Sequence, residues 1–186
     1  MPEFKFDGKE FFSTAEFHAD RAAADHLHEA GHVPRLYAVA AAVNALVATG
    51  AVSVIDYGCG SGGLLSLIAA PEKRGYDFQP DNVRFAQELG RPVEFKNFVD
   101  AEPEFSDVAV LSEVLEHMDD PHGFLGKLNC RVLVASVPLG ETPQQHYELH
   151  RWGWCMDSFR EMLKAAGFTS QSGVNVVGTQ VWTAVR

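Results

Sequence analysis

Apolar residues follow two different spacings along the chain. Short runs rich in apolar and β-branched residues are typical of strands buried within a sheet. Such runs predict strands over 52–55, 93–98, 108–111 and 132–137, and a further short strand is expected to end at residue 77. Apolar residues at helical spacing, or stretches of strong helix formers, predict helices over 15–30, 34–47, 62–70, 80–89, 121–128 and 156–166. From residue 52 onward strands and helices alternate, which predicts a parallel sheet covered by helices.

The C-terminal end of the chain departs from this alternation. Two strand-like segments, 172–177 and 180–185, flank the turn residue Gly178. Two strands joined by so short a turn pair antiparallel. The sequence therefore predicts an antiparallel hairpin at the end of an otherwise parallel sheet.

Composition and charge narrow the class of protein. The 186 residues, 46% hydrophobic and 22% charged, are ordinary for one globular domain. A formal net charge of -10 argues against a broad basic surface for nucleic acid. Neither a signal peptide nor an apolar stretch of about 20 residues that would span a membrane is expected. Three cysteines without paired spacing indicate no disulfide framework, so a cytoplasmic location is expected.

A glycine-rich segment, Val54–Gly63, comes directly after the first strand of the alternating region. Glycine lets the chain turn sharply into a helix and lets a ligand lie against bare backbone. Gly58, Gly60 and Gly63 fit the dinucleotide fingerprint, whereas Gly58, Gly60 and Gly62 fit the shorter form that binds S-adenosylmethionine. The glycine spacing alone leaves both ligands open.

Two acidic residues at predicted strand ends help to separate these ligands. Asp56 lies two residues before the first glycine, where a carboxylate can receive the ammonium group of an amino-acid ligand and would repel a pyrophosphate. Asp77 ends the next strand and is placed to accept hydrogen bonds from ribose hydroxyls, a role that both ligand classes share. The pair favours a nucleoside that carries an amino acid.

From Val54 onward the chain resembles class I S-adenosylmethionine-dependent methyltransferases. The similar segments, which occur in the order of that family, are Val54–Gly63, Asp77, Val99–Ala101, Leu111–His117, Ser136–Pro138 and Ala166–Phe168. The resemblance implies an α/β, Rossmann-like three-layer sandwich with a mostly parallel seven-stranded sheet and an antiparallel C-terminal hairpin. It implies a single methyltransferase domain over 1–186, with helices in 1–50 acting as a lid and a cofactor-binding core over 51–186.

The resemblance also implies a set of cofactor contacts. The glycine loop and the neighbouring strand ends would bind S-adenosylmethionine, with Asp100 at the edge of the adenine. The expected cofactor-binding residues are Asp56, Gly58, Cys59, Gly60, Gly62, Asp77, Phe78, Asp100, Ser112 and Glu113.

Carboxylates and imidazoles gather after the fourth strand of the alternating region. The i, i+3, i+4 spacing of Glu113, Glu116 and His117 places them on one face if the segment is helical. With His150, which precedes Trp152, they could form a Mg²⁺ or Mn²⁺ site of mixed carboxylate and imidazole ligands. Two other interpretations stay open: His117 as a general base or substrate contact, assisted by the two glutamates, or no direct role for the three residues.

The same residues carry two finer resemblances. The Glu-x-x-Glu-His segment is similar to ubiquinone-pathway O-methyltransferases, and together with the later His150 it is similar to small-RNA 3′-terminal 2′-O-methyltransferases. The leading hypothesis is O-methylation, with N-methylation as the lesser form, of a small or medium polar acceptor. The alternatives are metal-dependent RNA 3′-terminal 2′-O-methylation, which the acidic charge disfavours, a non-catalytic S-adenosylmethionine-binding module, and a nicotinamide dehydrogenase.

Histidines are also frequent before the glycine loop. Because no acidic or cysteine partner stands at obvious ligand spacing, solvent-exposed or core roles are expected for His18, His26, His28 and His32. If the N-terminal helices form a lid, His28, His32 and Arg35 are the residues there that could touch a substrate.

Overall fold

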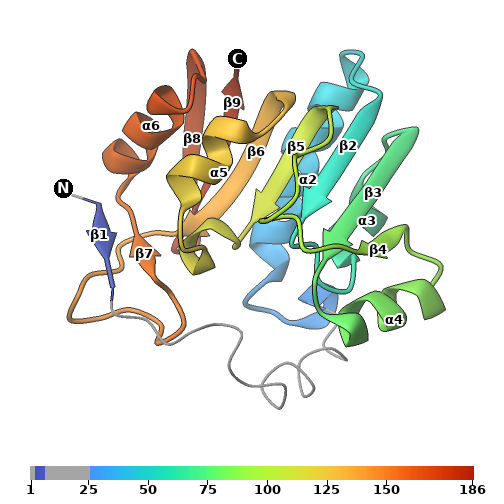
Figure 1. The fold of residues 1–186 in the computed structure, drawn as a ribbon, viewed down its shortest axis with the longest axis horizontal. Helices are drawn as coiled ribbons and strands as arrows, with labels where there is room; N and C mark the ends of the chain where they lie inside the picture. Colours follow the sequence, from blue (N-terminus) through green and yellow to red (C-terminus); the bar gives the residue numbers. More distant parts are fainter. Residues whose placement is uncertain (1–2, 7–25) are drawn as a thin grey trace.

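A seven-stranded sheet forms the centre of the computed structural model, which describes residues 3–6 and 26–186 (Figure 1). Its strands are β2 Ser53–Tyr57, β3 Glu72–Asp77, β4 Val93–Phe95, β5 Ser106–Ser112, β6 Cys130–Pro138, β8 Ser170–Val176 and β9 Thr179–Val185. They lie in the order β4-β3-β2-β5-β6-β9-β8, and only β9 pairs antiparallel with its two neighbours. The expected seven-stranded sheet with a C-terminal hairpin is confirmed.

Helices cover both faces of the sheet. The helical segments are η1 His26–His28, α2 Val33–Ala48, α3 Gly63–Leu67, α4 Pro80–Glu88, η2 Leu115–His117, α5 Pro121–Lys127 and α6 Met156–Ala165. One apolar core packs α5 and α6 against the sheet, and a second core packs α2, α3 and α4 against it. Successive strand residues therefore enter opposite cores, as Val54 and Ile55 do, which completes the three-layer sandwich.

Local sequence explains where several helices begin and end. Pro34 occupies the first turn of α2, where its missing N–H costs nothing, and Gly50, with φ of 113°, follows the end of that helix. The Asp120 side chain caps α5 by accepting a hydrogen bond from the backbone N–H of Gly123. These signals fix the predicted boundaries of most helices to within a few residues.

Two predicted helices differ from the structure. Of the expected 15–30 helix, residues 15–25 lie outside the described residues, and His26–His28 form only a 3₁₀ turn. The helix expected over 62–70 is α3, which ends at Leu67 because Ile68 adopts an extended conformation. The chain then enters β3 at Glu72, so the rest of the apolar stretch is a connection.

A second, two-stranded sheet was not expected from the sequence. β1 (Phe4–Lys5) pairs antiparallel with β7 (Trp152–Gly153), beside the C-terminal half of the domain (Figure 1). The Glu3 carboxylate accepts a hydrogen bond from Trp154 Nε1 at 2.9 Å, and Phe6 is buried. We call residues 3–6 the strap, because they tie the beginning of the described chain to its C-terminal half.

The parallel arrangement brings several strand ends to one edge of the sheet. β2, β3 and β5 end there at Tyr57, Asp77 and Ser112, next to the glycine loop. In open α/β sheets, ligands bind at this edge, outside the carboxyl ends of the strands. Within the described ranges, no helix combines the length and the apolar character needed to cross a membrane, and the cytoplasmic location stays a prediction.

Candidate active site

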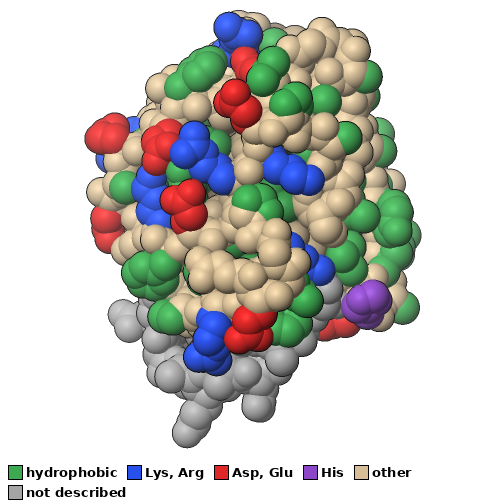
Figure 2. Space-filling model, turned by 90° about the vertical axis from the view of Figure 1, so that its right-hand side faces the viewer, with side chains coloured by type: hydrophobic (Ala, Val, Ile, Leu, Met, Phe, Trp, Pro, Cys, Tyr) green, Lys and Arg blue, Asp and Glu red, His purple; other side chains and the backbone are tan. Residues whose placement is uncertain are grey.

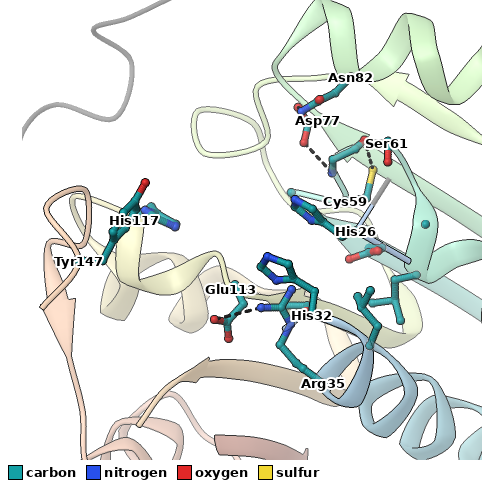
Figure 3. Close-up of a pocket in the computed structure, with 17 residues that line it drawn as sticks. His26, His32, Arg35, Cys59, Ser61, Asp77, Asn82, Glu113, His117 and Tyr147 are labelled. Atoms are coloured by element: carbon teal, nitrogen blue, oxygen red, sulfur yellow. Dashed lines mark hydrogen bonds and ion pairs between the residues drawn. The ribbon is translucent and has the colours of Figure 1, made fainter. Parts of the chain in front are cut away.

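A cavity of about 270 Å³ lies at this edge of the sheet (Figure 3). Its floor is the glycine loop, and it is flanked by Asp77 and Asn82 on one side and by His117 and Tyr147 on the other. His26, His32 and Arg35 of the η1–α2 region complete the lining. Strand ends and the N-terminal region therefore share one site.

The glycine loop holds a conformation that side chains would obstruct. Gly58 has φ of 72°, and a Cβ atom there would lie 2.7 Å from Val114 Cγ2. The backbone N–H groups of Gly58 and Cys59 donate to the Tyr76 carbonyl, which ties the loop to β3. The glycine loop thus leaves space above the backbone, as the sequence predicts.

Asp56 is a buried carboxylate with no hydrogen-bond partner among the described residues. Its residue is 1% exposed, and within the described part of the chain neither carboxylate oxygen has a hydrogen-bond partner. Burial, and to a lesser extent the charge of Asp77, raises the pKa of Asp56 to about 8. A carboxylate in this position lowers its free energy by meeting a cation.

Asp77 has the opposite environment. Its Oδ2 accepts the Gly60 N–H at 2.8 Å, and its Oδ1 accepts the Gln79 N–H at 2.8 Å and the Asn82 side-chain amide at 3.3 Å. Asp77 therefore orients the glycine loop and the beginning of α4 as well as lining the cavity.

A smaller apolar pocket of about 150 Å³ adjoins the cavity, and the two share Gly58, Asp77, Asn82, Glu113 and His117. Phe78, Phe98, Val99, Val114 and Met118 line it. Aromatic and apolar walls of this kind suit a flat ring.

Asp100, expected at the adenine edge, lies outside both linings. It is exposed, and its Oδ2 accepts a hydrogen bond from Asn97 Nδ2 at 2.6 Å. Phe98 and Val99 line the pocket instead. Val99 belongs to the predicted segment Val99–Ala101, whereas Phe98 was not expected because the acidic residue was taken as the contact.

Glu113 and Arg35 form an ion pair on the floor of the cavity. Glu113 directly follows β5 with a left-handed φ of 58°, and its Oε2 lies 3.2 Å from Arg35 Nη1 (Figure 3). Burial raises the pKa of Glu113 despite the neighbouring guanidinium. Glu113 is thus outside the following 3₁₀ turn, and the expected helical face of three residues does not form.

Glu116, His117 and His150 form a buried donor group. One ligand atom from each lies within 4.8 Å of the others, and Glu113 is not a member. Glu116 is fully buried, and neither of its carboxylate oxygens has a hydrogen-bond partner among the described residues. Burial, with a further contribution from Glu113, raises the pKa of Glu116 well above its ordinary value.

Loop residues hold both histidines of the buried donor group. His117 Nδ1 donates to the Leu149 carbonyl at 3.2 Å, and His150 Nδ1 lies 2.7 Å from Glu141 Oε2. Glu141 Oε1 also accepts the Tyr147 N–H at 2.9 Å. The sequence analysis missed Glu141, which is nine positions before His150 and belongs to no motif that was recognised.

Comparison with known proteins gives the family. A family model described as a methyltransferase domain matches residues 16–172. The chain belongs to this methyltransferase family. The expectations of a class I methyltransferase and of an enzyme that transfers methyl groups are confirmed.

Solved structures share the fold of this methyltransferase. Magnesium protoporphyrin IX methyltransferase from Synechocystis PCC 6803, with bound SAH, is 20% identical with a TM-score of 0.68, and the match covers 94% of this chain and 95% of that one. The methyltransferase domain of bacterial CtHen1-C is 20% identical with a TM-score of 0.65, and the coverages are 83% and 98%. At this identity the likeness establishes the fold alone.

A third similar structure is the small RNA methyltransferase HEN1, with 21% identity and a TM-score of 0.66 over 81% of this chain and 25% of that protein. A search of curated protein sequences found no significant match. The finer resemblance to ubiquinone-pathway enzymes therefore stays a prediction for this methyltransferase.

Most of the predicted cofactor residues meet at the two cavities of the methyltransferase. Those that line at least one of them are Asp56, Gly58, Cys59, Gly60, Asp77, Phe78, Ser112 and Glu113. Gly62, at the N-cap of α3, and the exposed Asp100 lie outside both linings. His18 lies outside the described residues. The roles of all these residues remain predictions.

Proposed function

We propose that this methyltransferase binds S-adenosylmethionine in the two adjoining cavities and methylates a hydroxyl group of a small or medium polar acceptor. The observation that carries the proposal is Asp56, a buried carboxylate that has no hydrogen-bond partner in the described part of the chain and lies beside a glycine loop with an open backbone. An ammonium group would give this buried carboxylate a partner of opposite charge. S-adenosylmethionine offers one.

The remaining lining matches the other parts of the same cofactor. Asp77 is a suitable acceptor for ribose hydroxyls, and the apolar pocket around Phe78 and Phe98 suits the adenine. Arg35 is the single Lys or Arg among the described lining residues, and its buried Nε has no hydrogen-bond partner. It suits the carboxylate of the methionine group.

The buried donor group is proposed to prepare the acceptor. When bound, the cofactor supplies a methyl group on a sulfonium sulfur; transfer forms an O–C bond, breaks the S–C bond and releases S-adenosylhomocysteine. Without a metal ion, the hydroxyl proton goes to the imidazole of His117, which lines the cavity. Tyr147 lines the same side of the cavity and helps to position the acceptor.

The same donor group fits a divalent metal ion. Two imidazoles and a carboxylate without a hydrogen-bond partner form a mixed donor set, and Glu141 orients His150 as outer carboxylates orient metal-binding histidines. We propose Glu116, His117 and His150 as ligands of Mg²⁺ or Mn²⁺. Glu113 is not a ligand, but its negative charge acts on Glu116. Such an ion would supply a Lewis acid beside the acceptor oxygen.

The donor group also supports a second candidate function, metal-dependent methylation of an RNA 3′-terminal 2′-hydroxyl. A net charge of -10 weighs against it. On the side of α4 and β4, basic side chains stand next to acidic ones (Figure 2), and Arg74 and Lys96 both pair with Glu104. A small acceptor is therefore the first choice.

Calorimetric titration of S-adenosylhomocysteine tests the proposal. We expect micromolar binding by the wild type and about 100-fold weaker binding by Asp56→Asn, which loses a buried charge pair of about 3 kcal/mol. Asp157→Asn, a change of an exposed aspartate on α6, should bind as the wild type does. No binding by folded wild type, equal binding by Asp56→Asn, or tighter binding of NADH would overturn the proposal.

A screen of acceptors follows if the cofactor binds. Hydroxylated small molecules and a short RNA with a free 3′ end are incubated with labelled cofactor, with and without Mn²⁺. Methylation of the RNA, weakened by salt, would favour the second candidate function. Tight cofactor binding without transfer to any acceptor would favour a binding module.

A further inference from the structure

Three polar residues before α2 lie on one side of two successive tight turns. The Glu29 N–H donates to the His26 carbonyl at 3.3 Å, and the His32 N–H donates to the Glu29 carbonyl at 2.9 Å. Both bonds close i to i+3 turns, and side chains three residues apart eclipse one another in 3₁₀ geometry. The backbone itself therefore aligns His26, Glu29 and His32.

The side chains of these residues converge. His32 Nε2 lies 3.1 Å from Glu29 Oε2, and the imidazole rings of His26 and His32 stack with centroids 4.5 Å apart. One ligand atom from each of the three residues lies within 4.8 Å of the others. We call these three residues the turn group.

The donor types and spacing suit a transition-metal ion. Zn²⁺ binds imidazole nitrogen and carboxylate oxygen at about 2.0–2.2 Å, which places tetrahedral ligands about 3.4 Å from one another. The Glu29–His32 pair, at 3.1 Å, is close to that separation, and a ligand atom of His26 lies within 4.8 Å of both partners. Two histidines and one glutamate also form a zinc set that leaves a fourth position for water or a ligand.

We propose that His26, Glu29 and His32 bind a divalent transition-metal ion of the Zn²⁺ class, in a site distinct from the buried donor group. Imidazole ligands favour such an ion over Mg²⁺, which prefers oxygen ligands. The site uses none of the residues to which the proposed methyl transfer assigns a role, although it borders the same cavity.

The location of the turn group means that a bound ion would affect the neighbouring cavity. His26 and His32 line the same cavity as Asp56 (Figure 3). An ion that holds both imidazoles fixes the segment between η1 and α2 along that cavity. Ion and cofactor affinities are therefore coupled, and the coupling is reciprocal.

The experiment uses full-length, tag-free protein and Zn²⁺ as the probe. Because the buried donor group also offers imidazoles, all proteins carry Glu116→Gln, which removes its carboxylate. Zinc affinity is measured by competition with a chromophoric chelator for this parent, for the parent with His32→Gln, and for the parent with His28→Gln. His28 lies in the same 3₁₀ helix as His26 but is not a member of the turn group, which makes it the matched control.

We expect the parent to bind one zinc ion at this site, His32→Gln to weaken binding at least tenfold, and His28→Gln to change it less than twofold. Excess Mg²⁺ should not displace the zinc. A folded parent, judged by circular dichroism, that binds no zinc would overturn the proposal. Equal weakening by His28→Gln and His32→Gln would overturn it as well, because it would indicate a loose histidine cluster.

Discussion

The two ends of the cavity are built differently. The cofactor end, comprising Asp56, the glycine loop and Asp77, consists of strand ends and one tight turn held by sheet pairing. The acceptor end, comprising the buried donor group and Glu141, consists of a 3₁₀ turn and a long loop after β6. The strap packs against that loop, since the Phe6 ring stacks on His146 with centroids 4.0 Å apart.

The two ends therefore depend on different contacts. Residues of the cofactor end are close in sequence and are positioned by neighbouring parallel strands. At the acceptor end, the contact between His117 and Leu149 spans 32 positions, and the contact between Glu3 and Trp154 spans 151. The cofactor end should thus tolerate changes in the loop and the strap, whereas the acceptor end should not.

The largest expected effect comes from Glu116→Gln. The change removes the buried carboxylate of the donor group and keeps its shape, so Mn²⁺ binding should weaken about 100-fold or more. S-adenosylhomocysteine affinity should stay within twofold of wild type. Mn²⁺ titration followed by electron paramagnetic resonance measures the first quantity, and calorimetry measures the second.

Glu161→Gln, a change of an exposed glutamate on α6, is the control for Glu116→Gln. Loss of cofactor binding in Glu116→Gln would show that the two ends are not separable. Unchanged Mn²⁺ binding would remove the buried donor group as the metal site.

Glu141→Gln should have the next largest effect. Its carboxylate orients His150 and holds the Tyr147 N–H, and loss of such an outer partner lowers metal affinity by about 10- to 100-fold. Glu141→Asp should recover part of the loss. Glu148→Gln, in the same loop, is the matched control for Mn²⁺ titration, and an equal loss in both variants would indicate general loosening of the loop.

The cofactor end should respond to pH through Asp56. The pKa of about 8 means that the carboxylate needed to bind an ammonium group is mostly protonated at pH 6. Affinity for S-adenosylhomocysteine should therefore rise by up to about tenfold per pH unit between pH 6 and pH 8. Calorimetry at pH 6, 7 and 8 checks this, and a flat profile in the wild type would contradict it.

The same carboxyl group predicts the pH dependence of stability without ligand. Its pKa in the folded protein lies above the ordinary value of 3.8, so its contribution is largest at low pH and is lost as pH rises through about 8. Asp56→Asn should remove this dependence. Thermal unfolding of the two proteins across pH 5 to pH 8.5 measures the difference.

The smallest expected effect is that of Phe6→Ala. Loss of the stack on His146 loosens the loop that carries His150, so Mn²⁺ affinity should fall only about threefold, the equivalent of about 0.6 kcal/mol. S-adenosylhomocysteine affinity should not change. Phe95→Ala, a change of an exposed residue, is the control. An equal loss at both ends would show that the strap stabilises the whole domain.

Sequence patterns predict which residues gather at the proposed cofactor end, for a physical reason. Asp56 and Asp77 lie at the ends of two neighbouring strands, and parallel strands that end together bring those residues to one edge whatever the details of packing. Gly58 and Gly60 have positive φ, a conformation that glycine adopts readily, so these residues themselves indicate the turn. Local patterns therefore carry most of the information about the fold and this half of the site.

The acceptor end depends on contacts that no local pattern records. Glu141 lies in a loop without a motif, and Arg35 meets Glu113 only because α2 packs beside β5 and β6. Spacing did suggest Glu116, His117 and His150, yet it assumed a helix that includes Glu113. The left-handed backbone at Glu113 turns that residue toward Arg35. Helical spacing in the sequence cannot predict such a contact, because it depends on how α2 packs against the sheet.

Closure of the strap has a consequence for the order in which the domain assembles. Joining Glu3 to Trp154 encloses a loop of about 150 residues, and the entropy lost on closing a loop grows with its length. The neighbouring strands β2 and β3, which carry the cofactor end, enclose a far shorter loop and are favoured early. A newly made chain should therefore gain the ability to hold its cofactor before it completes the surface that selects an acceptor.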